Sequence, residues 1–164
     1  MTGVQTCALP IWLTGSISVE IGTLSKLTHL DLSHNRLEGN ISVEIGTLSK
    51  LTHLDLSGNG FTGSISVEIG TLSKLSKLTH LDLSLNHLTG KLPPSFGNLT
   101  RLVRFNISSN SINGSIPKEL GNLTNLLELD LGGNYFIGSI PTTNVNLYDA
   151  STIIAYDSIK PAMI

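Results

Sequence analysis

The sequence is poor in cysteine and in charge and lacks long apolar runs, and each shortage excludes a class of protein. Cys7 is the single cysteine, so no intramolecular disulfide framework is available, and charged residues make up only 13% of the 164 residues. Lysine and arginine are scattered singly and the formal net charge is −2, which excludes a basic stripe for nucleic acid and a polybasic membrane patch. No run approaches the roughly 18 consecutive apolar residues of a membrane span. We expect no nucleic-acid partner and no direct membrane contact for these residues.

Catalytic constellations are also missing from the sequence. It contains no nucleophile beside a base, no glycine-rich phosphate loop and no paired carboxylates that a pocket could enclose. We therefore predict no enzymatic activity for this chain, no catalytic residues, no cofactor and no metal site. A content of 40% apolar residues is nevertheless enough to build the core of one ordinary domain.

The first eleven residues, MTGVQTCALPI, share no pattern with the rest of the chain. Residues 2–11 resemble the translation of a common sequencing-adapter oligonucleotide. We interpret residues 1–11 as a non-native leader and exclude them from fold reasoning. Cys7 then carries no information about the redox compartment.

Repetition is what the sequence has in abundance. The stretch SVEIGTLSKLTHLDLS occupies residues 18–33 and returns unchanged at residues 42–57. Successive units open at Leu24, Leu48, Leu75, Leu99 and Leu123, spaced 24, 27, 24 and 24 residues apart, and the longer unit contains an extra Ser-Lys-Leu. A fixed period of this size predicts a solenoid. We divide residues 12–146 into these units, with 147–164 as an irregular or truncated tail: 12–23 (partial), 24–47, 48–74, 75–98, 99–122 and 123–146.

Each unit follows the pattern L-x-x-L-x-x-L-x-L-x-x-N-x-L. The L-x-L core has a period of two, which predicts a short strand with leucines pointing inward, and one strand per unit would stack into a parallel sheet. A buried amide where the strand ends can bond to backbone groups of neighbouring turns. We expect a structural asparagine ladder: Asn35, Asn59, Asn86, Asn110 and Asn134.

A second motif follows the asparagine and reads LTGKLP at residues 88–93, INGSIP at 112–117 and FIGSIP at 136–141. With these L-x-G-x-I-P segments the chain resembles the plant-type leucine-rich repeats, although the early units place serine where the motif has proline. The resemblance implies an α/β fold: a leucine-rich-repeat solenoid forming a curved right-handed superhelix, with a parallel β-sheet on the concave side. It also implies a second short strand in each unit and short helical turns on the convex side.

The same resemblance implies a function, because this subclass is best known from receptor-like kinases, receptor-like proteins and secreted inhibitors of cell-wall-degrading enzymes. We expect a fragment of an extracellular ectodomain, on the outer face of the plasma membrane or secreted, that recognises a protein, peptide or small hormone, together with a co-receptor. The kinase domain of the receptor kinases would reside elsewhere. The alternatives are an intracellular leucine-rich repeat scaffold or immune-receptor domain, and a non-functional gene or assembly fragment.

Exposed positions vary only in the fourth and fifth units, because the first three are near-identical copies. Variety is what specific binding needs, and arginine and tyrosine often dominate interface energies. We predict these ligand-binding candidates: Arg104, Asn106, Ser109, Ser111, Glu128, Asp130 and Tyr135.

Five N-x-[ST] sequons are present, slightly more than chance predicts, which fits a secreted surface. The glycosylation candidates are Asn40, Asn98, Asn106, Asn113 and Asn122.

The copied units also align three histidines, His29, His53 and His80, in one outward column, with an aspartate two residues after each. Imidazole and carboxylate suit zinc, and histidine titrates near neutrality, so the column is compatible with a metal site or a pH-sensing ladder. Duplication of one histidine explains the column as well, and nothing in the sequence orients a metal's ligands. We assign no metal to it.

Overall fold

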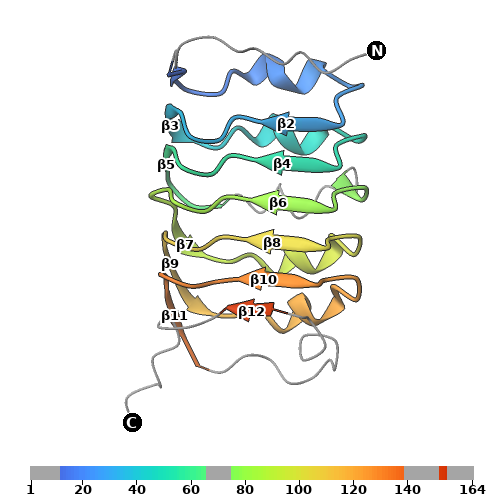
Figure 1. Ribbon diagram of the computed structural model, residues 1–164, viewed down its shortest axis with the longest axis vertical. Helices are drawn as coiled ribbons and strands as arrows, with labels where there is room; N and C mark the ends of the chain where they lie inside the picture. The colour runs from blue at the N-terminus through green and yellow to red at the C-terminus, as the bar shows by residue number, and fades with distance from the viewer. Residues whose placement is uncertain (1–11, 66–74, 139–151, 155–164) are drawn as a thin grey trace.

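The computed structural model describes residues 12–65, 75–138 and 152–154, the last three as backbone only. The leader at residues 1–11, most of the tail at 147–164 and the beginning of the Ser-Lys-Leu insertion lie outside the described residues. Within the described part, the chain coils into a stack of similar turns with one strand from each turn facing the viewer in Figure 1.

The main sheet contains six parallel strands, one per turn, in the order β12-β10-β8-β6-β4-β2. Because each turn of the coil advances by one strand spacing, sequence order and spatial order coincide (Figure 1). The strands are β2 (His29–Asp31), β4 (His53–Asp55), β6 (His80–Asp82), β8 (Arg104–Asn106), β10 (Glu128–Asp130) and β12 (Thr152–Ile154).

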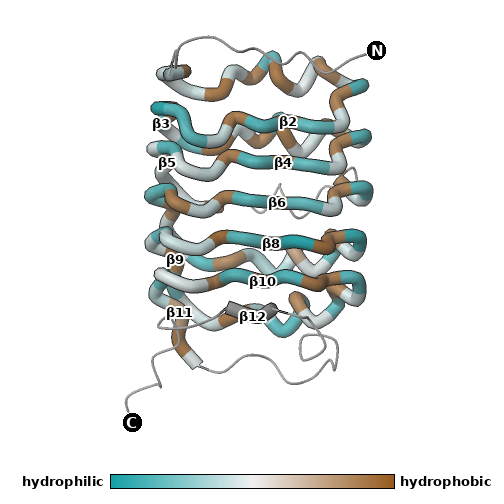
Figure 2. The backbone as a smooth tube through the Cα atoms, in the orientation of Figure 1, coloured by the Kyte–Doolittle hydropathy of each residue, from teal (hydrophilic) through white to brown (hydrophobic). Residues whose placement is uncertain are grey.

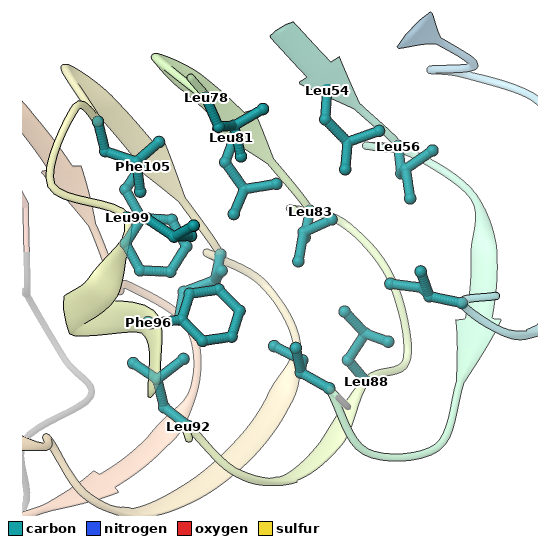
Figure 3. Close-up of a cluster of buried hydrophobic side chains, with 14 of the residues drawn as sticks. Leu54, Leu56, Leu78, Leu81, Leu83, Leu88, Leu92, Phe96, Leu99 and Phe105 are labelled. Carbon is teal, nitrogen blue, oxygen red and sulfur yellow. The ribbon is translucent and has the colours of Figure 1, made fainter. Parts of the chain in front are cut away.

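Strand register follows the repeat and survives the longer unit. Leu54 pairs with Leu81 across the 27-residue spacing, and Leu81 pairs with Phe105 across the ordinary spacing of 24. The central residue of each strand points inward, and these three side chains are no more than 1% exposed. Figure 3 shows them projecting from neighbouring strands into one core. Leu56 and Leu83, which follow the ends of β4 and β6 in the chain, point into the same core. The inward leucines predicted by the period of two therefore form the core of the solenoid.

A second layer of strands runs along one side of the solenoid, at the left edge of Figure 1. It consists of two three-stranded parallel sheets joined by a bridge between Ser64 and Thr89. The strands are β1 (Thr14–Gly15), β3 (Arg36–Asn40) and β5 (Gly60–Thr62), then β7 (Thr89–Lys91), β9 (Ser111–Ser115) and β11 (Tyr135–Ile137). These are the second strands that the L-x-G-x-I-P motif implied. Its glycine is required by backbone geometry: Gly114 has φ +80°, a left-handed conformation that side chains disfavour.

Short 3₁₀ helices occupy the convex side: η1 (Val19–Thr23), η2 (Val43–Thr47), η4 (Pro94–Asn98) and η5 (Lys118–Asn122). Each follows the last position of the L-x-G-x-I-P motif. Pro93 and Pro117 have φ −66° and −62° there, and Ser18 and Ser42 adopt −66° and −61° without a ring to impose it. The serines of the early units therefore reproduce the entry geometry of the proline, and the fold class inferred from the sequence is confirmed.

The five asparagines lie where the predicted ladder placed them, between the main sheet and the second layer. Asn59 is a representative case. Its Nδ2 donates to the Leu32 carbonyl of the preceding turn at 2.9 Å and to two carbonyls of its own turn. Its Oδ1 accepts from the backbone N–H of Leu37 at 3.0 Å. One buried amide thus links two turns, which satisfies backbone groups that no strand pairing reaches.

Candidate ligand-recognition groove

A groove of about 530 Å³ runs across the concave sheet. It is lined by the three residues of each of the strands β2, β4, β6, β8 and β10. Because alternate residues of a strand face the same way, the first and third residue of every strand form two parallel columns on this face. Figure 2 shows teal, hydrophilic positions recurring along these strands from one turn to the next.

The first column begins with three stacked imidazoles. The ring centroids of His29 and His53 are 4.3 Å apart and those of His53 and His80 are 4.2 Å apart, with interplanar angles of 14° and 10°. The in-register parallel pairing of their strands produces this arrangement. The rings therefore form one nearly continuous stack along the groove.

Threonine hydroxyls contact the Nδ1 atoms of two of these rings. Thr52 Oγ1 donates to the Thr28 carbonyl at 2.9 Å and lies 2.9 Å from His53 Nδ1. Thr79 Oγ1 donates to the Thr52 carbonyl at 3.0 Å and lies 2.9 Å from His80 Nδ1. A hydroxyl has only one hydrogen, so each Nδ1 must carry the proton that bridges it to the threonine. In the neutral ring, Nε2 is then left as a hydrogen-bond acceptor for His53 and His80.

Two of the histidines favour the neutral form. Desolvation lowers the pKa of His53 below its ordinary value of 6.5, and the neighbouring His80 and His29 lower it further. Desolvation likewise lowers the pKa of His80, followed by repulsion from Arg104, while Glu128 opposes the shift. Both rings are therefore uncharged at neutral pH, and protonating the stack places like charges side by side.

The second column consists of carboxylates that also hold the turns. Oδ1 of Asp31 accepts from the Ser33 N–H at 2.9 Å, and Oδ1 of Asp55 accepts from the Ser57 N–H at the same distance. Asn106 occupies the equivalent position on β8, where its Oδ1 accepts from the Ser108 N–H at 3.0 Å. Each of these aspartates thus terminates its strand with a hydrogen bond to the following turn.

Comparison with known proteins places this groove in a family context. The model of the leucine-rich repeat family matches residues 76–136, and a model of two leucine-rich repeats matches residues 25–69. The leucine-rich repeat ectodomain of the receptor kinase SOBIR1 from Arabidopsis thaliana is 39% identical, with a TM-score of 0.70. That match covers 77% of this chain and 68% of that one. The chain belongs to the leucine-rich repeat family of plant receptor-kinase ectodomains.

Larger receptors share the same leucine-rich repeat architecture. A TDR receptor structure is 37% identical with a TM-score of 0.76, covering 79% of this chain and 22% of that chain. The Arabidopsis receptor kinase HAESA, in complex with the peptide hormone IDA and the co-receptor SERK1, is 34% identical with a TM-score of 0.77. That match covers 87% of this chain and 23% of HAESA, so the chain spans about a fifth of the length of these receptors. No curated protein matches the chain.

The groove of this leucine-rich repeat chain contains four of the seven predicted ligand-binding residues: Arg104, Asn106, Glu128 and Asp130. Arg104 Nε and Glu128 Oε2 form an ion pair of 3.1 Å across β8 and β10, with side chains 59% and 48% exposed.

The other three predicted residues lie outside the groove. Ser109 is in the turn after β8, with φ +55°. Ser111 and Tyr135 begin β9 and β11 of the second layer, and Tyr135 is 61% exposed beside Asn113 of the neighbouring strand. These three candidates therefore do not share the groove: Ser109 follows the end of β8, and the motif after the asparagine places Ser111 and Tyr135 on another sheet.

The sequons also separate by face. Asn98 and Asn122 end η4 and η5 on the convex side, and Asn40 and Asn113 lie in strands of the second layer. All four are exposed. Asn106 alone among the five lies in the groove, where its Nδ2 donates to Asp82 Oδ2 at 3.0 Å.

Duplication explains the histidine column in the sequence, yet the three histidines and the aspartate two residues after each line the groove over β2, β4 and β6. The common register that aligns these residues in the sequence also places every copy on the same face of the sheet, but it does not by itself predict a groove. In the described residues, no group of three or more histidine, cysteine or carboxylate side chains has the arrangement of a metal site. No helix among those residues is both long enough and apolar enough to cross a bilayer.

Proposed function

We propose that the chain is a non-catalytic recognition module of an extracellular plant receptor, and that its concave groove binds a peptide. The observation that carries the proposal is the groove itself, formed by the same three positions of five successive strands. A preformed, curved surface of this kind suits an extended ligand, because little protein conformational entropy is lost on binding. HAESA, which has the same fold at 34% identity, is known in complex with a peptide hormone.

The wider assignment follows from the same relatives. Receptor-like kinases and receptor-like proteins act in signalling or defence, and we propose that the parent protein does so at the outer face of the plasma membrane or after secretion. The exposed sequons on the convex side and the second layer support an extracellular location, because glycans there would leave the groove open. A co-receptor would complete the complex, as SERK1 does with HAESA.

Peptide selection on the full chain tests the proposal. Peptides that bind the full chain would be selected from a random displayed library. Their affinities for the unchanged chain and for two arginine-to-alanine variants would then be measured by calorimetry. Arg104→Ala removes a guanidinium from the groove, whereas Arg101→Ala removes an exposed one just after η4, outside it. We expect the first to cost about 1–3 kcal/mol of binding free energy and the second almost nothing. Selected peptides that are insensitive to Arg104→Ala and sensitive to Arg101→Ala would place binding on the convex side and refute the proposal.

A further inference from the structure

We propose that the part of the groove over β2, β4 and β6 binds arginine or lysine side chains of an extended peptide at neutral pH and releases them on acidification. The proposal rests on the proposed function, peptide recognition by the concave groove, and adds the chemical class of the ligand. Three features carry it: the charge of this part of the groove, its hydrogen-bonding polarity, and the stacked histidines.

Charge is one-sided over these three strands. Asp31, Asp55 and Asp82 contribute three carboxylates, and no lysine or arginine is among the residues of β2, β4 and β6 that line the groove. The nearest cation along the column, Arg104 on β8, already pairs with Glu128. A partner with positive side chains is therefore the one with complementary charge, and an acidic partner is repelled.

Hydrogen-bonding polarity leads to the same ligand class. Each aspartate commits Oδ1 to the following turn, and within the described residues Oδ2 of Asp31 and Asp55 has no hydrogen-bond partner. In the neutral rings of His53 and His80, Nε2 is also an acceptor, because Nδ1 is bonded to threonine. At neutral pH this surface accepts hydrogen bonds, so it requires a ligand rich in donors. Guanidinium groups supply several donors in a rigid planar fork.

Acidification reverses both properties. Protonation of the stack turns each Nε2 from an acceptor into a charged donor, next to other rings 4.2 to 4.3 Å away. His53 on β4 faces His29 and Asp31 on β2 and His80 and Asp82 on β6. The remaining charged groups near the stack are Asp55 on β4 itself, Arg104 on β8 and, beyond it, Glu128 on β10.

Acidification below the ordinary histidine pKa of about 6.5 adds positive charge to the stack. Desolvation lowers the pKa of His53 and His80, so these two rings gain their charge at a lower pH. Positive charge on the rings offsets part of the negative charge of the three aspartates. A bound arginine therefore loses the Nε2 acceptors and part of its electrostatic attraction.

Three matched synthetic peptides test the ligand class on the full chain. The first alternates arginine with glycine, the second replaces arginine by citrulline, which has the same shape without the charge, and the third uses glutamate. Affinities would be measured by fluorescence anisotropy at fixed ionic strength, at about pH 7.5 and about pH 5.5. We expect the arginine peptide to bind most tightly at the higher pH. Its affinity should be roughly tenfold lower at the lower pH, which is the change expected if bound arginine lowers the pKa of one histidine by one unit.

Two sets of substitutions assign the effect to named groups. Asp31→Asn, Asp55→Asn and Asp82→Asn together remove the charge while keeping the turn, because Asn106 already makes the same bond at this position. We expect this variant to lose the preference for arginine over citrulline. The charge-matched control changes carboxylates outside the groove: Glu20→Gln, Glu38→Gln and Glu119→Gln.

Replacing His29, His53 and His80 by glutamine should keep binding at about pH 7.5 and abolish its pH dependence. The control here is His34→Gln with His87→Gln, which leaves the stack intact. Equal or tighter binding of the glutamate peptide, with sensitivity to Arg104→Ala, would overturn the cationic ligand class and leave peptide recognition standing. Failure of all three peptides together with failure of the library selection would overturn both proposals. Unchanged pH dependence after the glutamine substitutions would overturn the role of the histidines.

Discussion

Substituting one asparagine of the ladder should destabilise the solenoid far more than its small side chain suggests. Asn110 is 8% exposed, and its Oδ1 accepts from the Leu88 N–H at 3.0 Å. Its Nδ2 donates to three carbonyls at 3.0 to 3.2 Å. Each of those carbonyls also accepts from a second donor, so Asn110→Ala leaves mainly the Leu88 N–H unsatisfied. That group costs about 1–3 kcal/mol, and with the weakened carbonyl bonds we expect a total loss of about 3 kcal/mol.

The assay is urea unfolding of the full chain, followed by circular dichroism. Asn125→Ala is the control, because that asparagine is exposed and makes a single bond to the Thr100 carbonyl at 2.8 Å. We expect it to cost less than about 1 kcal/mol. If the two variants lose equal stability, the ladder contributes no more than a surface hydrogen bond and the reasoning is wrong.

Asn110→Asp separates the accepting role of the amide from its donating role. A carboxylate still accepts from Leu88 but faces carbonyl oxygens where an amide donated, so its folded-state pKa would lie above the unfolded value of about 3.9. The free energy of unfolding should then fall as pH rises through that range, and recover in acid where the carboxyl group again donates. Asn110→Ala should show no such recovery.

Leu85 has φ +54°, a left-handed conformation, at a turn position where other units have Gly58 and Gly133. Leu85→Gly should therefore raise the free energy of unfolding by roughly 1 kcal/mol. The control Leu127→Gly, at another exposed leucine, should lower the free energy of unfolding. A double-mutant cycle on Arg104 and Glu128 should give a coupling of only about 0.2–1 kcal/mol that disappears in high salt, because both side chains are about half exposed. The pKa of His53, measured by NMR titration, should lie below 6.5. Because folding lowers this pKa, the contribution of His53 to the free energy of unfolding should be unchanged well above pH 6.5 and should decrease as the pH drops below 6.5. A titration at or above the ordinary value would contradict the desolvation of the stack.

Periodicity predicts the parts of this fold that depend only on which residues recur. Leu54 and Leu81 had to point inward and in register because both units repeat the same two-residue alternation, and the structure places them so. Asn59 could likewise be placed by its position after the strand. These predictions succeed because a solenoid contacts only its neighbouring turns, so one unit's pattern determines the environment of the next.

Other features depend on the path of the chain between the strands, which periodicity does not specify. Tyr135 and Arg104 are both ligand-binding candidates in the sequence, yet the two lie on different sheets, because the turn at Asn134 redirects the chain from β10 to β11. The sequence pattern also does not predict the strand β12, since after Leu147 alanine replaces leucine at Ala150 and Ala155. It nevertheless pairs with β10 in register, with Ile153 opposite Leu129 and 24 residues after it. An isoleucine in place of leucine concealed the continuing period.

Exact repetition has a physical consequence for recognition by the groove. Because identical units stack in register, one choice of side chain is multiplied into a column, as for His29 and its two copies. A ligand reading only such columns gains almost the same energy when it shifts by one strand, so its register is poorly defined. The columns change at β8, where Arg104 replaces the histidine and Asn106 replaces the aspartate. A peptide with cationic groups over the first three strands and a carboxylate at Arg104 loses that last contact on shifting by one strand. We therefore expect this boundary, rather than the repeated columns, to set the register of a bound peptide.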